Sequence, residues 1–249
     1  MASFSQMIVI QLGKLQNGGE LMKHSKIIYK ENLMSDTDDD VPTLSADTLA
    51  ALNEFYAEQT EEQKMVEAAL QTGQIKDIRL QEDWQLSQFW YTDDTAQRLA
   101  EEVLSIAGKE GRIACISAPT AYTKIKEIKP DKCSVTCLEF DRRFEIYGED
   151  FQYYDYNEPL NLPLDMKQSF DIVIADPPFL SEECLCKTAV TAKFLTKGKI
   201  ILCTGAVMQE AALKLLDARP CSFLPKHKNN LQNDFRCYTN YDSIFLNKS

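Results

Sequence analysis

The stretch Asp171–Phe179 reads DIVIADPPF. Its apolar run, IVIA, lies between two aspartates, and the second aspartate is followed by two prolines and an aromatic residue. Short continuous apolar runs are typical of strands that are buried on both faces of a parallel sheet. Proline fixes its own φ angle and keeps the preceding residue out of the helical region. The stretch therefore predicts a buried strand over Phe170–Ala175 that ends at Asp176 in rigid, extended backbone.

Apolar segments of strand length alternate with segments of helix length on both sides of this stretch. The expected helices cover residues 119–128, 142–149 and 181–196. This alternation predicts an α/β fold with a central, mostly parallel sheet and helices on both faces. The other expected strands are Gly111–Ser117, Ser134–Phe140, Phe151–Tyr154, Lys199–Cys203, Cys221–Leu224 and Phe235–Tyr241.

The chain before residue 83 differs in composition from the rest. Residues 1–33 carry four lysines and two glutamates, and the acidic, polar segment MSDTDDDVPTLSADT follows. Such a composition is typical of disorder, so we expect a flexible extension over residues 1–43. Apolar residues at helical spacing after Ser45 predict an N-terminal helix, which fills residues 44–82 together with a linker. The main domain is expected over residues 83–249.

Both tryptophans of the chain lie in one short segment, WQLSQFWY (Trp84–Tyr91). Aromatic side chains dominate burial in protein cores, so one interpretation is a helix that packs on the core. The other interpretation is an aromatic wall beside a pocket. The next residues, Thr92–Ile106, predict an amphipathic helix. The candidates for substrate binding are Trp84, Phe89, Trp90 and Tyr91.

Polar residues follow the expected strands at the edge where ligands bind. In an open parallel sheet, that edge lies beyond the carboxyl ends of the strands, near the point where the strand order reverses. The second expected strand ends in Glu139-Phe140-Asp141. Asp155 follows the third strand and Asp176 the fourth, whereas the first ends in 117–120, Ser-Ala-Pro-Thr. Several acids on one edge favour a polar ligand with several hydrogen-bond donors. A ribose diol and an adenine amine fit that description.

The sequence Asp-Pro-Pro-Phe at 176–179 has two interpretations. In the first, the Asp176 carboxylate and a nearby backbone carbonyl accept hydrogen bonds from one amine, and Phe179 forms an apolar or π wall. Those bonds would fix the amine with its lone pair directed at an electrophile. In the second, the prolines form a rigid turn and Asp176 caps the following helix.

Composition restricts the kinds of partner. The net charge is −11 and the pI is about 4.8, which disfavours nucleic acid, because phosphate backbones are held by Lys and Arg. It favours a basic protein partner. The eight cysteines form no CxxC and there are two histidines, so we expect reduced thiols and no metal site. No apolar run approaches the roughly 20 residues that span a bilayer, and we expect a cytoplasmic protein without a membrane partner.

The motifs together resemble the class I, S-adenosylmethionine-dependent methyltransferases that carry an (Asp/Asn)-Pro-Pro-(Phe/Tyr/Trp) motif. Within that class, the chain resembles the eukaryotic family first named for adenine methylation and now regarded as lysine methyltransferases of translation elongation factor 1-alpha. The resemblance runs from about Met34 to Asp242. It rests on the segments WQLSQFWY, RIACISAPT, LEFDRRF, FQYYDYNEPLNLP, DIVIADPPFLSEEC, GKIILCTG and NDFRCYTNYD.

The resemblance implies a Rossmann-like methyltransferase domain over residues 83–249. It also implies S-adenosylmethionine as cofactor and a lysine of elongation factor 1-alpha as substrate. The sequence Ser-Ala-Pro-Thr stands where most of the class has a glycine-rich loop. By motif, the acceptor amine is held by Asp176, Pro177, Pro178 and Phe179. The cofactor contacts are Glu139 and Asp141 at the ribose, Asp155 and Tyr156 at the adenine, and Ser117, Ala118 and Pro119 along the methionine part.

Two other functions stay open at this point. The first is methylation of adenine amines in nucleic acid, where the aromatic residue of the motif stacks on a flipped base. The nearest feature to a basic patch is Lys226–Lys228 with Arg236, a short cluster that is more typical of a solvated loop. The second is a module that binds the cofactor without turnover, because a fold alone does not determine function.

Overall fold

The computed structural model describes residues 45–72, 80, 82–83, 86–229 and 233–247. The expected extension over 1–43 lies outside the described residues, so its boundary stays a prediction. The helix expected after Ser45 is present as α1 (Ala46–Thr72). Within the described part of the chain, no helix is both long and apolar enough to cross a bilayer.

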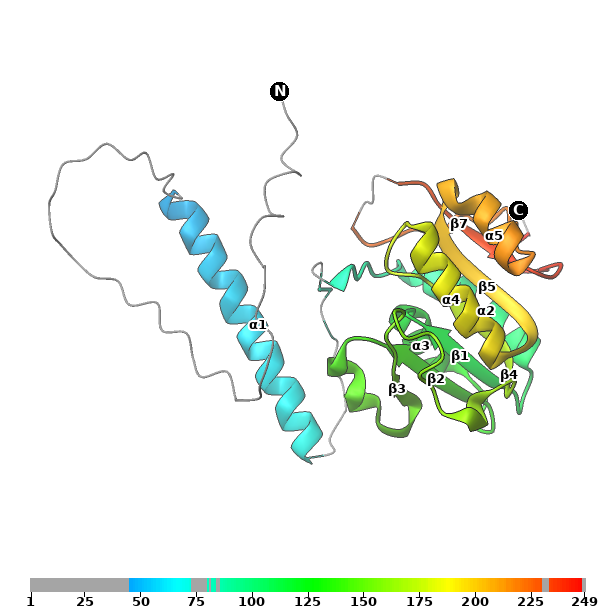
Figure 1. The fold of residues 1–249 in the computed structure, drawn as a ribbon. Helices are drawn as coiled ribbons and strands as arrows, with labels where there is room; N and C mark the ends of the chain where they lie inside the picture. Colours follow the sequence, from blue (N-terminus) through cyan, green and yellow to red (C-terminus); the bar gives the residue numbers. More distant parts are fainter. Residues whose placement is uncertain (1–44, 73–79, 81, 84–85, 230–232, 248–249) are drawn as a thin grey trace, which may run out of the picture. The chain divides into compact units, whose positions relative to one another are not determined.

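A seven-stranded sheet forms the centre of the main domain, with the strand order β3-β2-β1-β4-β5-β7-β6 (Figure 1). The strands β1 to β5 pair in parallel, whereas β7 pairs antiparallel with β5 and β6. The mostly parallel α/β fold predicted from the sequence is thus confirmed. The strands are β1 (Arg112–Ile116), β2 (Ser134–Glu139), β3 (Phe151–Tyr153), β4 (Phe170–Ala175), β5 (Thr196–Gly205), β6 (Arg219–Pro220) and β7 (Phe235–Thr239).

Helices cover both faces of the sheet, so the central strands are buried on two sides (Figure 1). Ile113 and Cys115 of β1 enter one core, whereas Ala114 and Ile116 enter the other. This alternation explains why the strands read as continuous apolar runs. One face is covered by α2 (Asp93–Ala107) and α3 (Pro119–Ile128), and the other by α4 (Glu182–Leu195) and α5 (Gln209–Leu216).

The pairing of β1 with β2 and β4 determines where the ends of these strands lie. Ile116 of β1 aligns with Leu138 of β2 and with Ala175 of β4. The strand order reverses between β1 and β4, since β2 and β3 lie on one side of β1 and the later strands on the other. Ligands of open α/β sheets bind in the crevice at such a reversal. The residues that follow these three in the chain therefore emerge together at that crevice.

Two segments near the C-terminus differ from the prediction. The expected strand Cys221–Leu224 is wrong, because the short strand is Arg219–Pro220 instead. Beyond it, the Phe223 amide donates to the Leu246 carbonyl at 2.9 Å, which takes the chain out of the sheet. The helix α5 was not predicted, since Gln209–Leu216 has no capping side chain at its start to mark it in the sequence.

Two further segments are less regular than their composition suggests. The expected helix over 142–149 is a 3₁₀ segment, η3 (Arg142–Asp150), which is interrupted where Gly148 adopts a φ of 60°. The described part of the aromatic segment, residues 86–91, does not form an α-helix. Instead, Tyr91 makes an isolated antiparallel bridge to His227. The helix expected for this segment is therefore wrong for its described residues, whereas Tyr91 does pack in the core.

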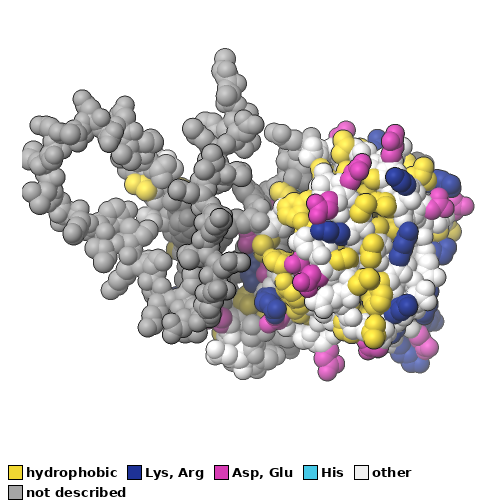
Figure 2. Space-filling model, viewed as in Figure 1, with side chains coloured by type: hydrophobic (Ala, Val, Ile, Leu, Met, Phe, Trp, Pro, Cys, Tyr) yellow, Lys and Arg dark blue, Asp and Glu magenta, His cyan; other side chains and the backbone are white. Residues whose placement is uncertain are grey.

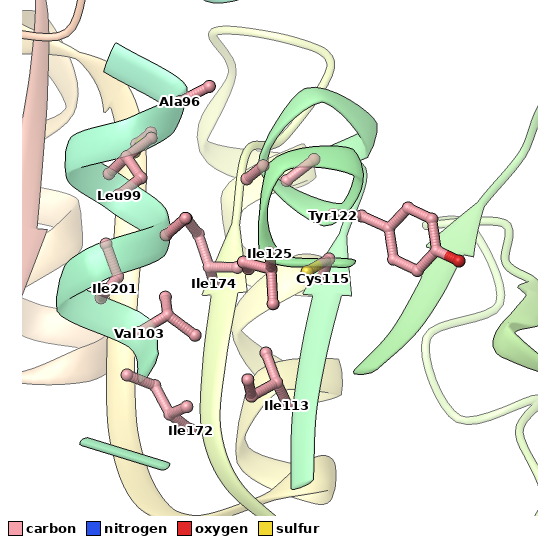
Figure 3. Close-up of a cluster of buried hydrophobic side chains, with 14 of the residues drawn as sticks. Ala96, Leu99, Val103, Ile113, Cys115, Tyr122, Ile125, Ile172, Ile174 and Ile201 are labelled. Atoms are coloured by element: carbon pink, nitrogen blue, oxygen red, sulfur yellow. The ribbon is translucent and has the colours of Figure 1, made fainter. Parts of the chain in front are cut away.

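The helix α2 is attached to the sheet by an apolar stripe (Figure 3). Leu99 and Val103 are fully buried in one cluster with Ile172 and Ile201. Thr92 caps the helix, because its side chain accepts a hydrogen bond from the backbone of Thr95. This helix continues directly from the aromatic segment, so its packing also fixes where that segment ends.

The stripe predicts a large effect of one truncation. Leu99→Ala should lower the free energy of unfolding by about 2–5 kcal/mol, because it removes buried methyl groups and leaves a cavity. Urea denaturation measures the change. The control is Leu213→Ala on α5, where the side chain is 46% exposed and the expected change is about 0.5 kcal/mol or less. Equal losses in the two variants would contradict the packing described here.

Candidate active site

A pocket opens at the edge of the sheet where β1, β2 and β4 end. It lies at the reversal of strand order, where the sequence placed the site. The structure brings together residues from all three groups that the sequence singled out. The predicted residues that line it are Phe89, Trp90, Tyr91, Ser117, Ala118, Pro119, Glu139, Asp176, Pro177 and Pro178.

Asp176 occupies the end of β4 and is half-buried in the pocket wall. Its backbone amide donates to the Ile116 carbonyl at 3.0 Å, which continues the pairing of β4 with β1. Burial raises the pKa of Asp176 to about 7, the Tyr91 hydroxyl lowers it, and nearby Glu139 raises it. The following helix is capped by Ser181, whose side chain accepts from the Cys184 amide at 3.2 Å. Asp176 is therefore not a helix cap and faces the pocket.

The Tyr91 hydroxyl donates a hydrogen bond to Asp176 Oδ2 at 2.5 Å. The phenol is 1% exposed. Burial and the adjacent carboxylate raise the pKa of Tyr91 well above its usual value, so the hydroxyl keeps its proton and acts as the donor. The Tyr91 ring lies 5.0 Å from the His227 ring, which in turn lies 4.8 Å from the Phe235 ring. Both neighbours line the same pocket.

His227 belongs to the basic cluster that the sequence indicated as a solvated loop. The structure instead attaches this loop to the aromatic segment: the Thr92 amide donates to the Lys226 carbonyl, and the Lys228 amide donates to the Trp90 carbonyl. Burial lowers the pKa of His227 to about 4, so the ring is neutral at physiological pH. The charge pattern gave no signal for this residue, because its role depends on pairing with a segment far away in the chain.

Glu139 ends β2 and is buried at the pocket wall. Its Oε1 accepts a hydrogen bond from the Phe140 amide at 3.0 Å. Burial raises the pKa of Glu139 to about 7. Among the described residues, Oε2 has no hydrogen-bond partner. This oxygen is available to a ligand that carries hydroxyl donors.

The end of β1 leads directly into α3 without a glycine. Ser117 adopts a φ of 49°, in the left-handed region that few side chains occupy, and its amide donates to the Leu138 carbonyl at 2.8 Å. Ala118 stands at the cap position without a side-chain hydrogen bond, and Pro119 is the first helical residue. The start of α3 thus presents unpaired backbone N–H groups and the positive end of the helix dipole at the pocket wall.

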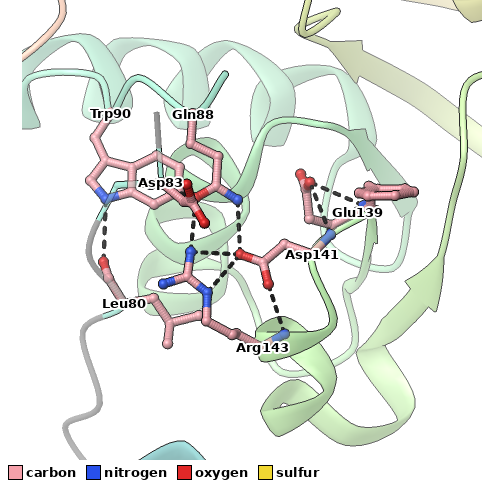
Figure 4. A network of polar contacts seen from close by, with 8 residues as sticks. Leu80, Asp83, Gln88, Trp90, Glu139, Asp141 and Arg143 are labelled. Carbon is pink, nitrogen blue, oxygen red and sulfur yellow. Dashed lines mark hydrogen bonds and ion pairs between the residues drawn. The ribbon is translucent and has the colours of Figure 1, made fainter. Parts of the chain in front are cut away.

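Asp141 is buried and engaged with protein groups (Figure 4). It accepts from Gln88 Nε2 at 2.9 Å and from the Arg143 amide at 2.9 Å, and it pairs with the Arg143 guanidinium at 2.7 Å. Gln88 Oε1 also accepts from the Asp83 amide at 3.0 Å. Asp141 therefore anchors the aromatic segment to the end of β2 and does not line the pocket.

Three other predicted residues lie outside the pocket lining. Asp155 accepts a hydrogen bond from the Asn157 amide at 2.8 Å. Tyr156 and Phe179 meet edge to face at 5.7 Å, and Phe179 is 44% exposed. Their roles in binding stay predictions. Trp84 lies outside the described residues. The lining residues that sequence reasoning missed are Leu86, Ser87, Gln88, Thr120, Leu180, His227, Asn233 and Phe235.

The chain matches the model of one protein family. Residues 82–243 match the family described as probable N6-adenine methyltransferase. This span covers more than half of the chain and includes every residue that lines the pocket.

Curated proteins from several organisms are similar over most of their length. EEF1A lysine methyltransferase 1 of Gallus gallus is 58% identical, with coverage of 84% of this chain and 99% of that protein. The Homo sapiens protein of the same name is 54% identical, over 84% and 97%. Protein-lysine N-methyltransferase EFM5 of Saccharomyces cerevisiae is 40% identical, over 80% and 92%.

Solved structures are similar to this chain at low identity. A putative RNA methyltransferase from Pyrococcus horikoshii is 17% identical, with a TM-score of 0.47 and coverage of 70% of this chain and 96% of that chain. The family resemblance predicted from the motifs is confirmed by the curated relatives. This chain belongs to the EEF1A lysine methyltransferase 1 family of methyltransferases.

Proposed function

We propose that this protein transfers a methyl group from S-adenosylmethionine to the ε-amino group of a lysine in translation elongation factor 1-alpha. The observation that carries the proposal is the Asp176 carboxylate, which faces the pocket with one oxygen held by Tyr91. The names of the curated relatives support the substrate, since five of them are called EEF1A lysine methyltransferase 1.

The residues at the pocket wall fit S-adenosylmethionine. Glu139 lines the pocket and its Oε2 accepts no hydrogen bond from the described residues, so this oxygen suits a ribose diol. The uncapped start of α3 at Pro119 offers backbone N–H groups and a positive dipole end, which suit the carboxylate of the methionine part. When bound, this cofactor supplies a methyl group that is already activated by a positive sulfur.

The chain's own residues then have to prepare the amine. A free lysine has a pKa of about 10.4 and arrives protonated. The partly apolar pocket disfavours that charge and lowers the lysine pKa. Asp176 orients the amine through its free oxygen, and a carboxyl with a pKa of about 7 accepts a proton more readily than an ordinary aspartate. Pro177, buried in the rigid turn, keeps that geometry fixed.

Surface charge supports a protein substrate over nucleic acid. The chain has a net charge of −11. On the face that Figure 2 shows, Lys and Arg side chains lie among acidic and hydrophobic ones and form no continuous basic stripe. Binding to a phosphate backbone relies on such a stripe. The cytoplasmic location expected from the sequence stays a prediction.

A transfer assay tests the proposed function. We expect radiolabel from S-adenosylmethionine to enter purified elongation factor 1-alpha, and peptide mass spectrometry to place it on a lysine. Asp176→Asn should reduce transfer to about one hundredth or less, because the amide carries no charge and takes no proton. The control is Asp217→Asn: Asp217 has a left-handed φ of 49° after α5, which asparagine also tolerates.

Two outcomes of this assay would contradict the proposal. The first is label that enters DNA or RNA, resists protease and disappears with nuclease, which would identify an adenine methyltransferase. The second is cofactor binding without transfer to any component of a cell extract, which would identify a module without turnover. Transfer that is unchanged in Asp176→Asn would remove Asp176 from the reaction.

The same variant should be more stable than the wild type at alkaline pH. The carboxyl has a pKa near 3.9 when unfolded and about 7 when folded. Between these values the folded state binds the extra proton, so the stabilisation from this group is lost as the pH rises through 7. Asp176→Asn avoids the buried charge and should raise Tm at pH 8, by about 2–4 °C for each kcal/mol of destabilisation that it removes.

The difference should shrink at pH 5.5, where the wild-type carboxyl is protonated in the folded protein. Thermal unfolding of both proteins at the two pH values measures the effect. A Tm difference that does not change with pH would mean that burial does not raise the pKa of Asp176.

A further inference from the structure

We propose that Tyr91 is a positioning residue for the methyl transfer: it holds one oxygen of Asp176 so that the other receives the acceptor amine. The inference rests on the proposed function, in which Asp176 orients that amine. The Tyr91 hydroxyl binds Oδ2 at 2.5 Å. Among the described residues, the hydrogen bond from Tyr91 is the one that the Asp176 carboxylate accepts, and it leaves Oδ1 open. This contact therefore assigns Oδ2 to Tyr91 and leaves Oδ1 for the acceptor amine.

The Tyr91 ring is itself held from several sides. It packs on His227 at 5.0 Å, and His227 packs on Phe235 at 4.8 Å. Backbone hydrogen bonds hold the chain on both sides of Tyr91. The Thr92 amide donates to the Lys226 carbonyl, and the Lys228 amide donates to the Trp90 carbonyl. Tyr91 is 1% exposed, and hydrogen bonds hold the backbone on both sides of it, so its side chain has little freedom to turn.

The other end of the aromatic segment is anchored independently. Gln88 donates to Asp141 at 2.9 Å and accepts from the Arg143 guanidinium at 3.1 Å (Figure 4). The segment thus joins the end of β2 to the end of β4 across the pocket. Its attachment at two points fixes the place of the Tyr91 hydroxyl before any substrate binds. Prior placement of this kind removes entropy loss from the reaction itself.

A carboxylate with one bound oxygen has a single open direction for the amine. Without the Tyr91 hydroxyl, Asp176 can turn about its side-chain torsions, and either oxygen can face the pocket. A hydrogen bond to the charged form also favours that form. Tyr91 therefore keeps Asp176 oriented and lowers the pKa that burial raises. The titratable groups that face the pair among the described residues are Glu139 from β2, Cys203 from β5, Cys237 from β7 and His227 from the loop.

The competing explanation is that the hydrogen bond only satisfies a buried phenol. The chain offers a matched case of this kind, since the Tyr241 hydroxyl donates to the buried Glu102 at 2.9 Å, and neither residue lines the pocket. A merely structural bond affects stability. A positioning bond also affects the turnover number and the pH at which the enzyme becomes active.

The test compares Tyr91→Phe with Tyr241→Phe in the full chain. The concentrations of elongation factor 1-alpha and of S-adenosylmethionine are varied one at a time, and kcat and KM are measured from pH 6 to pH 9. We expect Tyr91→Phe to lower kcat by about 10–100-fold, with KM for the cofactor within about twofold of wild type. The inflection of kcat/KM near pH 7 should move up by about one unit. Tyr241→Phe should keep the wild-type kcat and inflection.

The outcomes separate the two proposals. If Asp176→Asn is inactive while Tyr91→Phe keeps the wild-type kcat and inflection, the positioning role is refuted and the proposed function stands. If Asp176→Asn keeps the wild-type kcat, Asp176 does not orient the amine and the positioning role of Tyr91 is refuted with it. If the wild-type protein transfers no methyl group to elongation factor 1-alpha, the proposed function itself fails. The position of the inflection does not depend on the fraction of folded enzyme, so a less stable Tyr91→Phe still gives a valid answer.

Discussion

The parallel pairing of β1 with both β2 and β4 is the constraint on which the site depends. It aligns Ile116 with Leu138 and Ala175, and the next residue along each strand emerges at the same crevice. Because the strand order reverses at this point, the chain leaves β1 and β4 toward opposite faces of the sheet, into α3 and α4, and the crevice between the two strand ends stays open. The positions of Ser117, Glu139 and Asp176 in the pocket all depend on this register. A shift of one residue would turn each side chain to the opposite face of the sheet.

The register also places two carboxyls where their charge is unfavourable. Burial raises the pKa values of Glu139 and Asp176 to about 7, and the charge of Glu139 contributes to the raised pKa of Asp176. Residues held in environments that oppose their charged form are common at functional sites. The structure compensates through donors from outside the sheet: the Phe140 amide at Glu139 and the Tyr91 hydroxyl at Asp176. The buried carboxyl of Asp176 therefore lowers the stability of the fold while it serves the proposed reaction.

Local patterns were sufficient to predict the five parallel strands and their polar ends. Phe170–Ala175 matches the predicted strand in full, because a run buried on both faces leaves a direct signature in the sequence. The role of Asp141 as an anchor for Gln88, and the place of His227 beside Tyr91, were not predictable in this way. Both depend on contacts between segments far apart in the chain. The family resemblance implied a ribose contact for Asp141, and the composition around His227 indicated a solvated loop.

The most direct test of this account is the protonation of Asp176 in the folded protein. Carbon-13 labelling of aspartate carboxyls allows a titration by NMR, with Asp176→Asn to assign the signal. We predict a titration midpoint near pH 7, the value that burial gives this carboxyl. A midpoint near pH 4, the value of an ordinary exposed aspartate, would contradict the claim that the end of β4 holds a desolvated carboxyl at the pocket.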